Sequence, residues 1–263
     1  MRILMLGDIY GNVGRRLVKM RLSGLRREIA ADWVIANGEN ATGGAGLSPK
    51  HRDELMKAGV DAVTGGNHIF ARPDWHELVA SSRCAERTLR PHNLGGDVLP
   101  GRGWVILERP GVSPIAVINL AGRIFMEPGE CPFRWADELH KRVPKGIPIL
   151  VDFHAEATSE KIAMAIYLDG RVALVAGTHT HVQTSDERIL PGGTAAITDL
   201  GMTGPSGGII GVEAGTILDR FVKGYSDRFT CADGPGVIEG IFLDIDEHGV
   251  GKSIERIRVR EET

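Results

Sequence analysis

A series of short apolar runs constrains the fold of this chain more than any other feature, and each run ends in glycine or a polar cluster. Near-continuous apolar runs of this length are typical of strands buried on both faces. Helical patterns lie between them, so the sequence predicts an α/β fold with a largely parallel core. The expected strands are Ile3 to Leu6, Trp33 to Ala36, Ala62 to Thr64, Ile115 to Leu120, Ile147 to Phe153, Val172 to Ala176 and Ala195 to Thr198.

Capping residues indicate where two of the helices begin and end. Ser48-Pro49 predicts an N-cap followed by a first-turn proline, and Gly59 is placed to end that helix. Thr158 or Ser159 is expected to cap a later helix that runs through Tyr167. These signals support alternation of strands and helices over most of the chain.

The C-terminal residues follow a different pattern. Residues 241–246 and 254–260 alternate with period two around His248-Gly249. This pattern predicts a solvent-facing antiparallel hairpin, so the sheet system is expected to be mixed. With 263 residues and no internal repeat or linker, the chain is expected to form a single domain over residues 1–263.

Composition excludes several classes of protein. A formal net charge of −3 is not that of a general binder of extended nucleic acid or of anionic membranes. No apolar stretch approaches the roughly 20 residues that span a bilayer. Three cysteines without a CxxC motif suit a reducing compartment and argue against a structural zinc cluster, so we expect a cytoplasmic protein. They are Cys84, Cys131 and Cys231.

Polar side chains follow five of the expected strands. The carboxyl ends of strands in an α/β sheet share one edge, where ligands bind. Two carboxylates, three asparagines and four histidines are therefore expected on one rim, and this conjunction predicts a metal site. The segments that carry them are Gly7-Asp8, Asn37 to Asn40, Gly65 to His68, His154 and Gly177 to His181.

The types of side chain constrain the metal. No thiolate is among them, and imidazole with carboxylate and amide oxygen suits iron, manganese, zinc or cobalt. The number of candidate ligands exceeds the three or four that one catalytic ion takes from a protein. It is sufficient for two ions that share a bridging carboxylate. Two ions about 3.5–4 Å apart suit in-line displacement at phosphorus.

These residues resemble the calcineurin-like metallophosphoesterase superfamily, and more closely its branch of bacterial YmdB-type phosphodiesterases. The resemblance runs from the first residues to about Arg260. It implies a sandwich of two mixed β-sheets flanked by helices, a di-metal centre that often holds iron, and hydrolysis of phosphodiesters, notably 2′,3′-cyclic nucleotides. The matching motifs are Gly7-Asp8, Asn37 to Ala41, Gly66 to His68, Val151 to Lys161, Gly177 to Thr184, Gly201 to Pro205 and Gly208 to Val212.

The resemblance also implies roles for individual residues. Glu39 would bridge two ions, and His68 would be the general acid. The expected mechanism is in-line attack by a metal-bridging hydroxide, with His68 protonating the leaving ribose oxygen. One ion would be held by Asp8, Glu39, Asn40 and His181, and the other by Glu39, Asn67, His154 and His179.

Two departures from the wider superfamily affect these assignments. The usual Asp-x-His is here Asp8-Ile9-Tyr10, so one histidine ligand is absent, and Asn40 is the candidate to compensate for it. The usual bridging aspartate is here Glu39, which is longer by one methylene. Tyr10, Arg123 and Gly204 are weaker candidates for contacts with substrate.

Other functions are also compatible with the sequence. A phosphomonoesterase is the nearest alternative. A regulatory binding protein of RNA metabolism that uses the metal site as a sensor is an alternative from another class. The expected partner is a small phosphodiester, without membrane or extended nucleic acid, and a homo-oligomer is left open.

Overall fold

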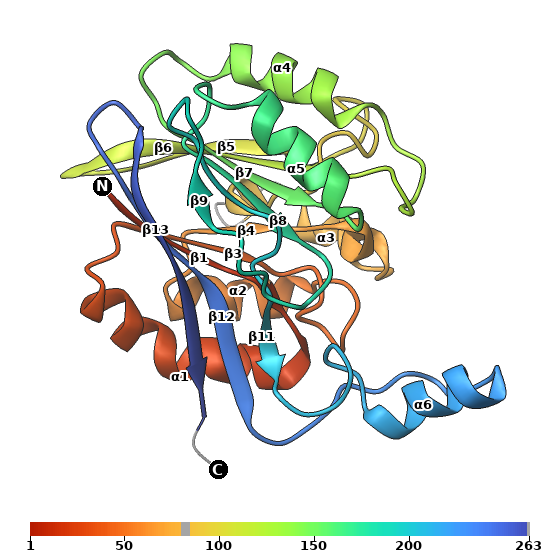
Figure 1. Cartoon of the computed structure of the whole chain (residues 1–263). Helices are drawn as coiled ribbons and strands as arrows, with labels where there is room; N and C mark the ends of the chain where they lie inside the picture. The colour runs from red at the N-terminus through yellow and green to blue at the C-terminus, as the bar shows by residue number, and fades with distance from the viewer. Residues whose placement is uncertain (80–84, 262–263) are drawn as a thin grey trace.

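Two β-sheets lie face to face in the computed structural model, which describes residues 1–79 and 85–261, and helices cover the outer face of each sheet (Figure 1). The first sheet has seven strands, in the order β2-β11-β12-β1-β3-β4 with β13 also paired to β12. The second has six, in the order β5-β6-β7-β8-β10-β9. The predicted sandwich of two mixed sheets flanked by helices is confirmed.

The first sheet combines parallel and antiparallel pairs. Strand β1 (Arg2–Leu6) is parallel to β3 (Trp33–Asn37), which is parallel to β4 (Ala62–Thr64). Strand β12 (Gly236–Ile245) runs antiparallel to both β1 and β13 (Gly251–Arg260). The other strands of this sheet are β2 (Asp8–Ile9) and β11 (Met202–Pro205).

The second sheet has a parallel centre. Strands β6 (Val112–Ala121), β7 (Ile149–His154), β8 (Leu174–Thr178) and β10 (Ala195–Ile197) pair in parallel, one after another. Antiparallel strands close both edges. They are β5 (Trp104–Arg109) and β9 (Arg188–Ile189).

Helices flank the sandwich on both sides. Helices α1 and α2 lie under the first sheet, α4 and α5 lie over the second, and α6 projects from the body (Figure 1). The bounds are α1 Gly11–Glu28, α2 Pro49–Ala58, α3 Trp75–Leu78, α4 Pro132–Arg142, α5 Thr158–Tyr167 and α6 Ala214–Lys223, with 3₁₀ turns η1 Asn67–Phe70 and η2 Ala85–Arg87.

Apolar side chains form one core between the two sheets and one further core between each sheet and the helices that cover it. Ile35 of the first sheet and Leu150 of the second belong to the central core. Leu17 of α1 packs with the first sheet, and Leu139 of α4 packs with the second. Because strands of both sheets are covered on two faces, they read as continuous apolar runs.

The boundaries predicted for α2 are confirmed, and for α5 the predicted end at Tyr167 is confirmed but the predicted cap is wrong. Ser48 precedes α2 and its hydroxyl accepts a 3.3 Å hydrogen bond from the His51 amide, while Gly59 ends the helix with φ 114°. Thr158 does not cap α5 but is its first residue, because Ala157 occupies the N-cap position without a side-chain hydrogen bond.

The predicted C-terminal hairpin is present, but only one of its strands is solvent-facing. Strand β13 is largely exposed, whereas β12 is buried over most of its length. The reason is that β12 pairs with β1 and β11 as well as with β13, so it lies within the sheet rather than at its edge.

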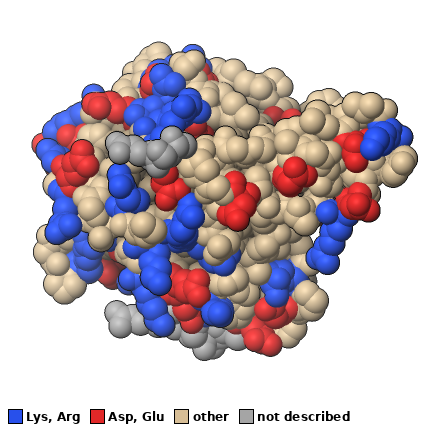
Figure 2. Space-filling view, turned by 90° about the horizontal axis from the view of Figure 1, so that it is seen from below, with Lys and Arg blue, Asp and Glu red and all other residues tan. Residues whose placement is uncertain are grey.

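The surface agrees with the near-balanced composition. Basic and acidic side chains are interspersed on the face drawn in Figure 2. Within residues 1–79 and 85–261, none of the helices has the length and apolar content of a transmembrane segment. Cys131 and Cys231 are free thiols, and Cys84 lies outside the described residues.

Candidate metal centre

Both sheets contribute to the rim on which the sequence places its polar residues. Asp8 follows β1, Glu39 and Asn40 follow β3, and the Asn67-His68 pair begins η1 after β4. From the second sheet, His154 ends β7. The pair His179 and His181 follows β8. The expectation of one sheet edge is therefore corrected: two facing sheets bring these side chains together.

The buried ring of His154 is the centre of one group. Its Nε2 lies 3.1 Å from Glu39 Oε1, 3.0 Å from Asn67 Oδ1 and 3.0 Å from His179 Nδ1. Ligand atoms of Glu39, His154 and His179 all lie within 4.8 Å of one another. Three acceptors thus face one ring nitrogen, and a single proton on that nitrogen cannot satisfy all of them.

Asp8 and His181 form a second group beside the first. Asp8 is fully buried, and its Oδ2 accepts a 3.2 Å hydrogen bond from the His179 amide. Its Oδ1 has no hydrogen-bond partner among the described residues, and it lies 3.8 Å from His181 Nε2. Leaving a buried carboxylate oxygen without a partner is costly, which suits a site that a cation completes.

A hydrogen-bond relay fixes the His154 ring. The Thr178 hydroxyl donates to Asp152 Oδ1 at 2.7 Å, so its oxygen accepts from His154 Nδ1 at 2.9 Å. Nδ1 therefore carries a proton, and Nε2 is the nitrogen that can bind a metal.

The rings of His179 and His181 are also oriented by a hydrogen-bond acceptor at their outer nitrogen. His179 Nε2 lies 3.1 Å from Glu156 Oε2, and His181 Nδ1 lies 2.8 Å from the Ile210 carbonyl oxygen. Each of these oxygens can only accept, so each outer ring nitrogen donates. The lone pairs of His179 Nδ1 and His181 Nε2 are left facing the centre.

Burial and mutual charge perturb the pKa values of the group. Burial raises the pKa of Asp8 to about 6, and burial lowers the pKa of His179 to about 3. For the pair of Glu39 and His154, burial is outweighed by their attraction, so the pKa of Glu39 falls to about 2 and that of His154 rises to about 9. A metal that binds here would have to displace the His154 Nε2 proton.

The backbone is shaped to bring the ligands close. A Cβ on Gly66 would lie 2.2 Å from Glu39 Oε2 and 2.3 Å from His154 Nε2, so only glycine fits there. His179 and His181 have φ values of 106° and 63°, which side-chain-bearing residues rarely adopt. Such strain persists only where the surroundings hold it, and it is typical of functional sites.

The residues present fit a metal. The Asp8 oxygen without a partner, the neutral His179 ring and the inward lone pairs are the features that a cation with nitrogen and oxygen ligands requires.

Asn40 connects the centre to His68. Its Nδ2 lies 3.1 Å from both Glu39 Oε1 and His181 Nε2, and its Oδ1 accepts from His68 Nδ1 at 2.9 Å. In this orientation the amide nitrogen faces the other ligands, so binding a metal through Oδ1 requires the amide to turn over. The His68 side chain is 44% exposed, and its amide donates to Glu39 Oε2 at 2.9 Å.

The three weaker candidates for contacts with substrate have different neighbours in the structure. The Tyr10 ring is buried and contacts His181 edge-on, with ring centroids 5.4 Å apart. Gly204 lies in β11, where a Cβ would come 2.9 Å from that of Tyr10. The Arg123 side chain is exposed, and its amide donates to Glu160. Tyr10 and Gly204 thus adjoin the site, whereas the Arg123 backbone is held by Glu160 instead.

Sequence reasoning missed the residues that orient the ligands. Glu156, Thr178 and Ile210 accept the outer ring protons of the three histidines. Glu156 and Thr178 lie within the matching motifs, two residues after His154 and one before His179, and this proximity was the available signal. Ile210 acts through a backbone carbonyl, which no residue type reveals.

A model of YmdB-like proteins matches residues 4–257. The chain belongs to the YmdB-like family. It is 44% identical over 264 residues to the 2′,3′-cyclic-nucleotide 2′-phosphodiesterase of Bacillus subtilis (strain 168), a match that covers 100% of this chain and 98% of that relative.

Two solved structures share the fold of this YmdB-like protein. A hypothetical protein from Thermus thermophilus has a TM-score of 0.92 at 40% identity, with 100% of both chains covered. A structure described as a novel phosphatase from Mycoplasma pneumoniae has a TM-score of 0.91 at 35% identity, covering 100% of this chain and 94% of that chain.

The relay through Thr178 makes a first prediction. Thr178→Val removes the hydroxyl that orients His154 while keeping the shape of the side chain, so metal affinity should fall by about 10–100-fold. Titration against a competing chelator measures this. Thr194→Val is the matched control, because Thr194 is also buried but its hydroxyl donates to the carbonyls of Leu168 and Val172. Equal affinities in the two variants would contradict a role for the relay.

Proposed function

We propose that this YmdB-like protein is a di-metal phosphodiesterase that hydrolyses small phosphodiesters, in particular 2′,3′-cyclic nucleotides. The observation that carries the proposal is the convergence of three oriented histidines on buried carboxylate and amide oxygens, one of which has no partner. The substrate class is supported by the name of the Bacillus subtilis relative, which is 44% identical over the whole chain.

The ligands divide into two sets that share Glu39. Asp8, His181 and Asn40 would hold one ion together with Glu39, and His154, His179 and Asn67 would hold the other. Iron is the proposed metal, with manganese, zinc and cobalt compatible with the same ligands. When bound, such ions activate water and offset charge on the phosphoryl oxygens.

The chain itself supplies a general acid beside this centre. His68 Nδ1 lies 2.9 Å from Asn40 Oδ1. With Oδ1 turned to an ion, Asn40 Nδ2 would donate to His68 Nδ1, so the ring proton would lie on Nε2, the nitrogen left for the substrate. The exposed side chain can reach a bound ligand, while its backbone amide is tied to Glu39. His68 thus protonates the leaving ribose oxygen from Nε2 as the bond to phosphorus breaks.

Metal analysis combined with a substrate screen tests the proposal. Protein purified without oxygen should contain about two ions per chain, and chelation should abolish hydrolysis until metal is restored. Bis-p-nitrophenyl phosphate and 2′,3′-cyclic AMP should both be cleaved, and 3′,5′-cyclic AMP is the comparison for ring specificity. Full activity in the stripped protein would contradict the proposal.

Phosphomonoesterase activity is the second candidate, favoured by the Mycoplasma pneumoniae structure described as a phosphatase. p-Nitrophenyl phosphate tests it in the same screen. Faster turnover of this monoester than of any diester would assign the protein to the alternative class.

A further inference from the structure

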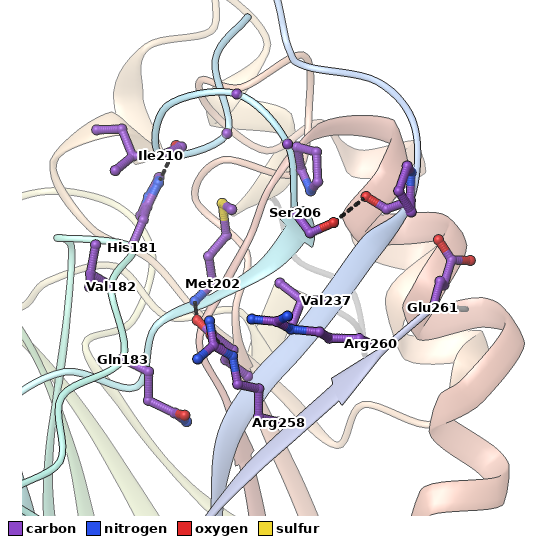
Figure 3. Close-up of a pocket in the computed structure, with 16 residues that line it drawn as sticks. His181, Val182, Gln183, Met202, Ser206, Ile210, Val237, Arg258, Arg260 and Glu261 are labelled. Atoms are coloured by element: carbon purple, nitrogen blue, oxygen red, sulfur yellow. Dashed lines mark hydrogen bonds and ion pairs between the residues drawn. The ribbon is translucent and has the colours of Figure 1, made fainter. Parts of the chain in front are cut away.

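A pocket of about 670 Å³ adjoins the candidate metal centre. His181 lines one side of it, and β13 contributes Arg258 and Arg260 on another (Figure 3). The loop from Pro205 to Gly211 forms the rim. Its volume lies in the range that binds small molecules.

One of the two arginines is held in place by a buried carboxylate. Arg258 Nε lies 2.9 Å from Glu239 Oε1, and Glu239 is only 4% exposed. The other oxygen of Glu239 accepts a 3.1 Å hydrogen bond from the Met202 amide. Because Glu239 is fixed within β12, it positions the Arg258 guanidinium at the pocket wall.

The charge of Arg260 is not balanced in this way. Glu261 is engaged by Arg16 at 2.6 Å, and Arg256 on the same face of β13 pairs with Glu187. Among the residues that the structure describes, no carboxylate forms an ion pair with Arg260. A charged residue on an edge strand also prevents that strand from pairing with another chain. An arginine in an ion pair would serve that purpose equally well, so it does not explain why Arg260 has no carboxylate partner.

The rim loop connects this pocket to the metal centre. Ser206 anchors the loop through a 2.9 Å hydrogen bond from its hydroxyl to the Pro235 carbonyl (Figure 3). Further along the loop, the Ile210 carbonyl accepts from His181 Nδ1. The amides of Gly207 and Gly208 have no hydrogen-bond acceptor among the described residues, so they are available to an anion.

We propose that this pocket binds a second phosphate group of the substrate, at Arg260 with support from Arg258 and the glycine amides. In a nucleoside 2′,3′-cyclic phosphate, a 5′-phosphate lies across the ribose from the reacting phosphorus and cannot enter the same centre. The substrate class is therefore a 2′,3′-cyclic nucleotide that carries a 5′-phosphate, either free or as the preceding linkage of a short oligoribonucleotide. The inference rests on the proposed function and specifies its substrate.

Three substrates of the wild-type protein test the proposal. They are adenosine 2′,3′-cyclic phosphate, its 5′-phosphorylated form, and the diadenosine dinucleotide that ends in a cyclic phosphate. The second phosphate should raise kcat/KM by about tenfold, since hydrogen bonds to charged groups are of that strength. If kcat/KM is raised for both phosphorylated substrates, a free phosphate group is sufficient for recognition. If kcat/KM is raised only for the dinucleotide, the pocket recognises the internal phosphodiester linkage. No advantage for either would overturn the proposal.

Arg260→Ala is the decisive variant. It should bring the ratio of kcat/KM for the phosphorylated and unphosphorylated substrates close to one. Arg134→Ala is the matched control, because Arg134 is an exposed arginine on α4 outside the pocket, and it should retain the wild-type ratio. An advantage that survives in Arg260→Ala would overturn the proposal.

An equilibrium measurement separates this inference from the proposed activity. Adenosine 3′,5′-bisphosphate should bind more tightly than adenosine 3′-phosphate to the wild-type protein by calorimetry, and Arg260→Ala should remove the difference. If no cyclic nucleotide is hydrolysed, the proposed function fails, while this difference in binding still decides whether the pocket recognises a second phosphate.

Discussion

Glu39→Gln should lower phosphodiester turnover by a factor on the order of 10³, because metal ions contribute several kcal/mol of charge stabilisation to such reactions. Glu39 Oε1 is 3.1 Å from His154 Nε2, and its carboxylate is the proposed link between the two ligand sets. The amide keeps the size of the side chain but removes the negative charge. Metal content should therefore fall together with turnover, as measured by elemental analysis and a steady-state assay.

Glu108→Gln is the matched control for this prediction, since Glu108 is an exposed residue of β5. Thermal denaturation of both variants checks that the fold is kept. A Glu39→Gln protein that retains two ions and wild-type turnover would contradict the bridging role. If the Glu39→Gln protein replaced the wild-type protein in cells although it no longer hydrolysed substrate, binding rather than hydrolysis would be the primary function.

The fold was predictable from sequence where burial dictates residue type. Strands such as β3 and β8 are covered on both faces, so they appear as apolar runs that end in polar residues. The burial of β12 was not predictable from its alternating pattern, because long-range pairing with β1 and β11 places it inside the sheet. Local periodicity reports the faces of a strand but not its neighbours.

The sequence predicted that the candidate residues would lie close together, but not the geometry of their side chains. His154 ends one strand, while Glu39 and His179 follow two others, and the topology brings the three side chains together. Their ring orientations depend on Thr178 and on the Ile210 carbonyl, which are ordinary residues in the sequence. The orientation of Asn40 likewise depends on three neighbours, so its expected role as a ligand remains a prediction.

His68→Ala should separate chemistry from metal binding. His68 is partly exposed and contacts the centre through Asn40 and through its own backbone amide, so both ions should remain bound. Loss of a general acid should lower turnover of 2′,3′-cyclic AMP by about 10²–10⁴-fold. His248→Ala is the control, because that ring is 78% exposed in the β12–β13 turn.

The leaving group provides the sharper test of His68. A ribose alkoxide needs a proton as it departs, whereas p-nitrophenolate is stable as an anion and gains little from a general acid. The loss in His68→Ala should therefore be much smaller with bis-p-nitrophenyl phosphate than with the cyclic nucleotide. Equal losses on both substrates would show that His68 positions the centre through Asn40 instead, and unchanged turnover of the cyclic nucleotide would exclude both roles. A selective loss with full metal content is the result expected of proton donation to the departing oxygen.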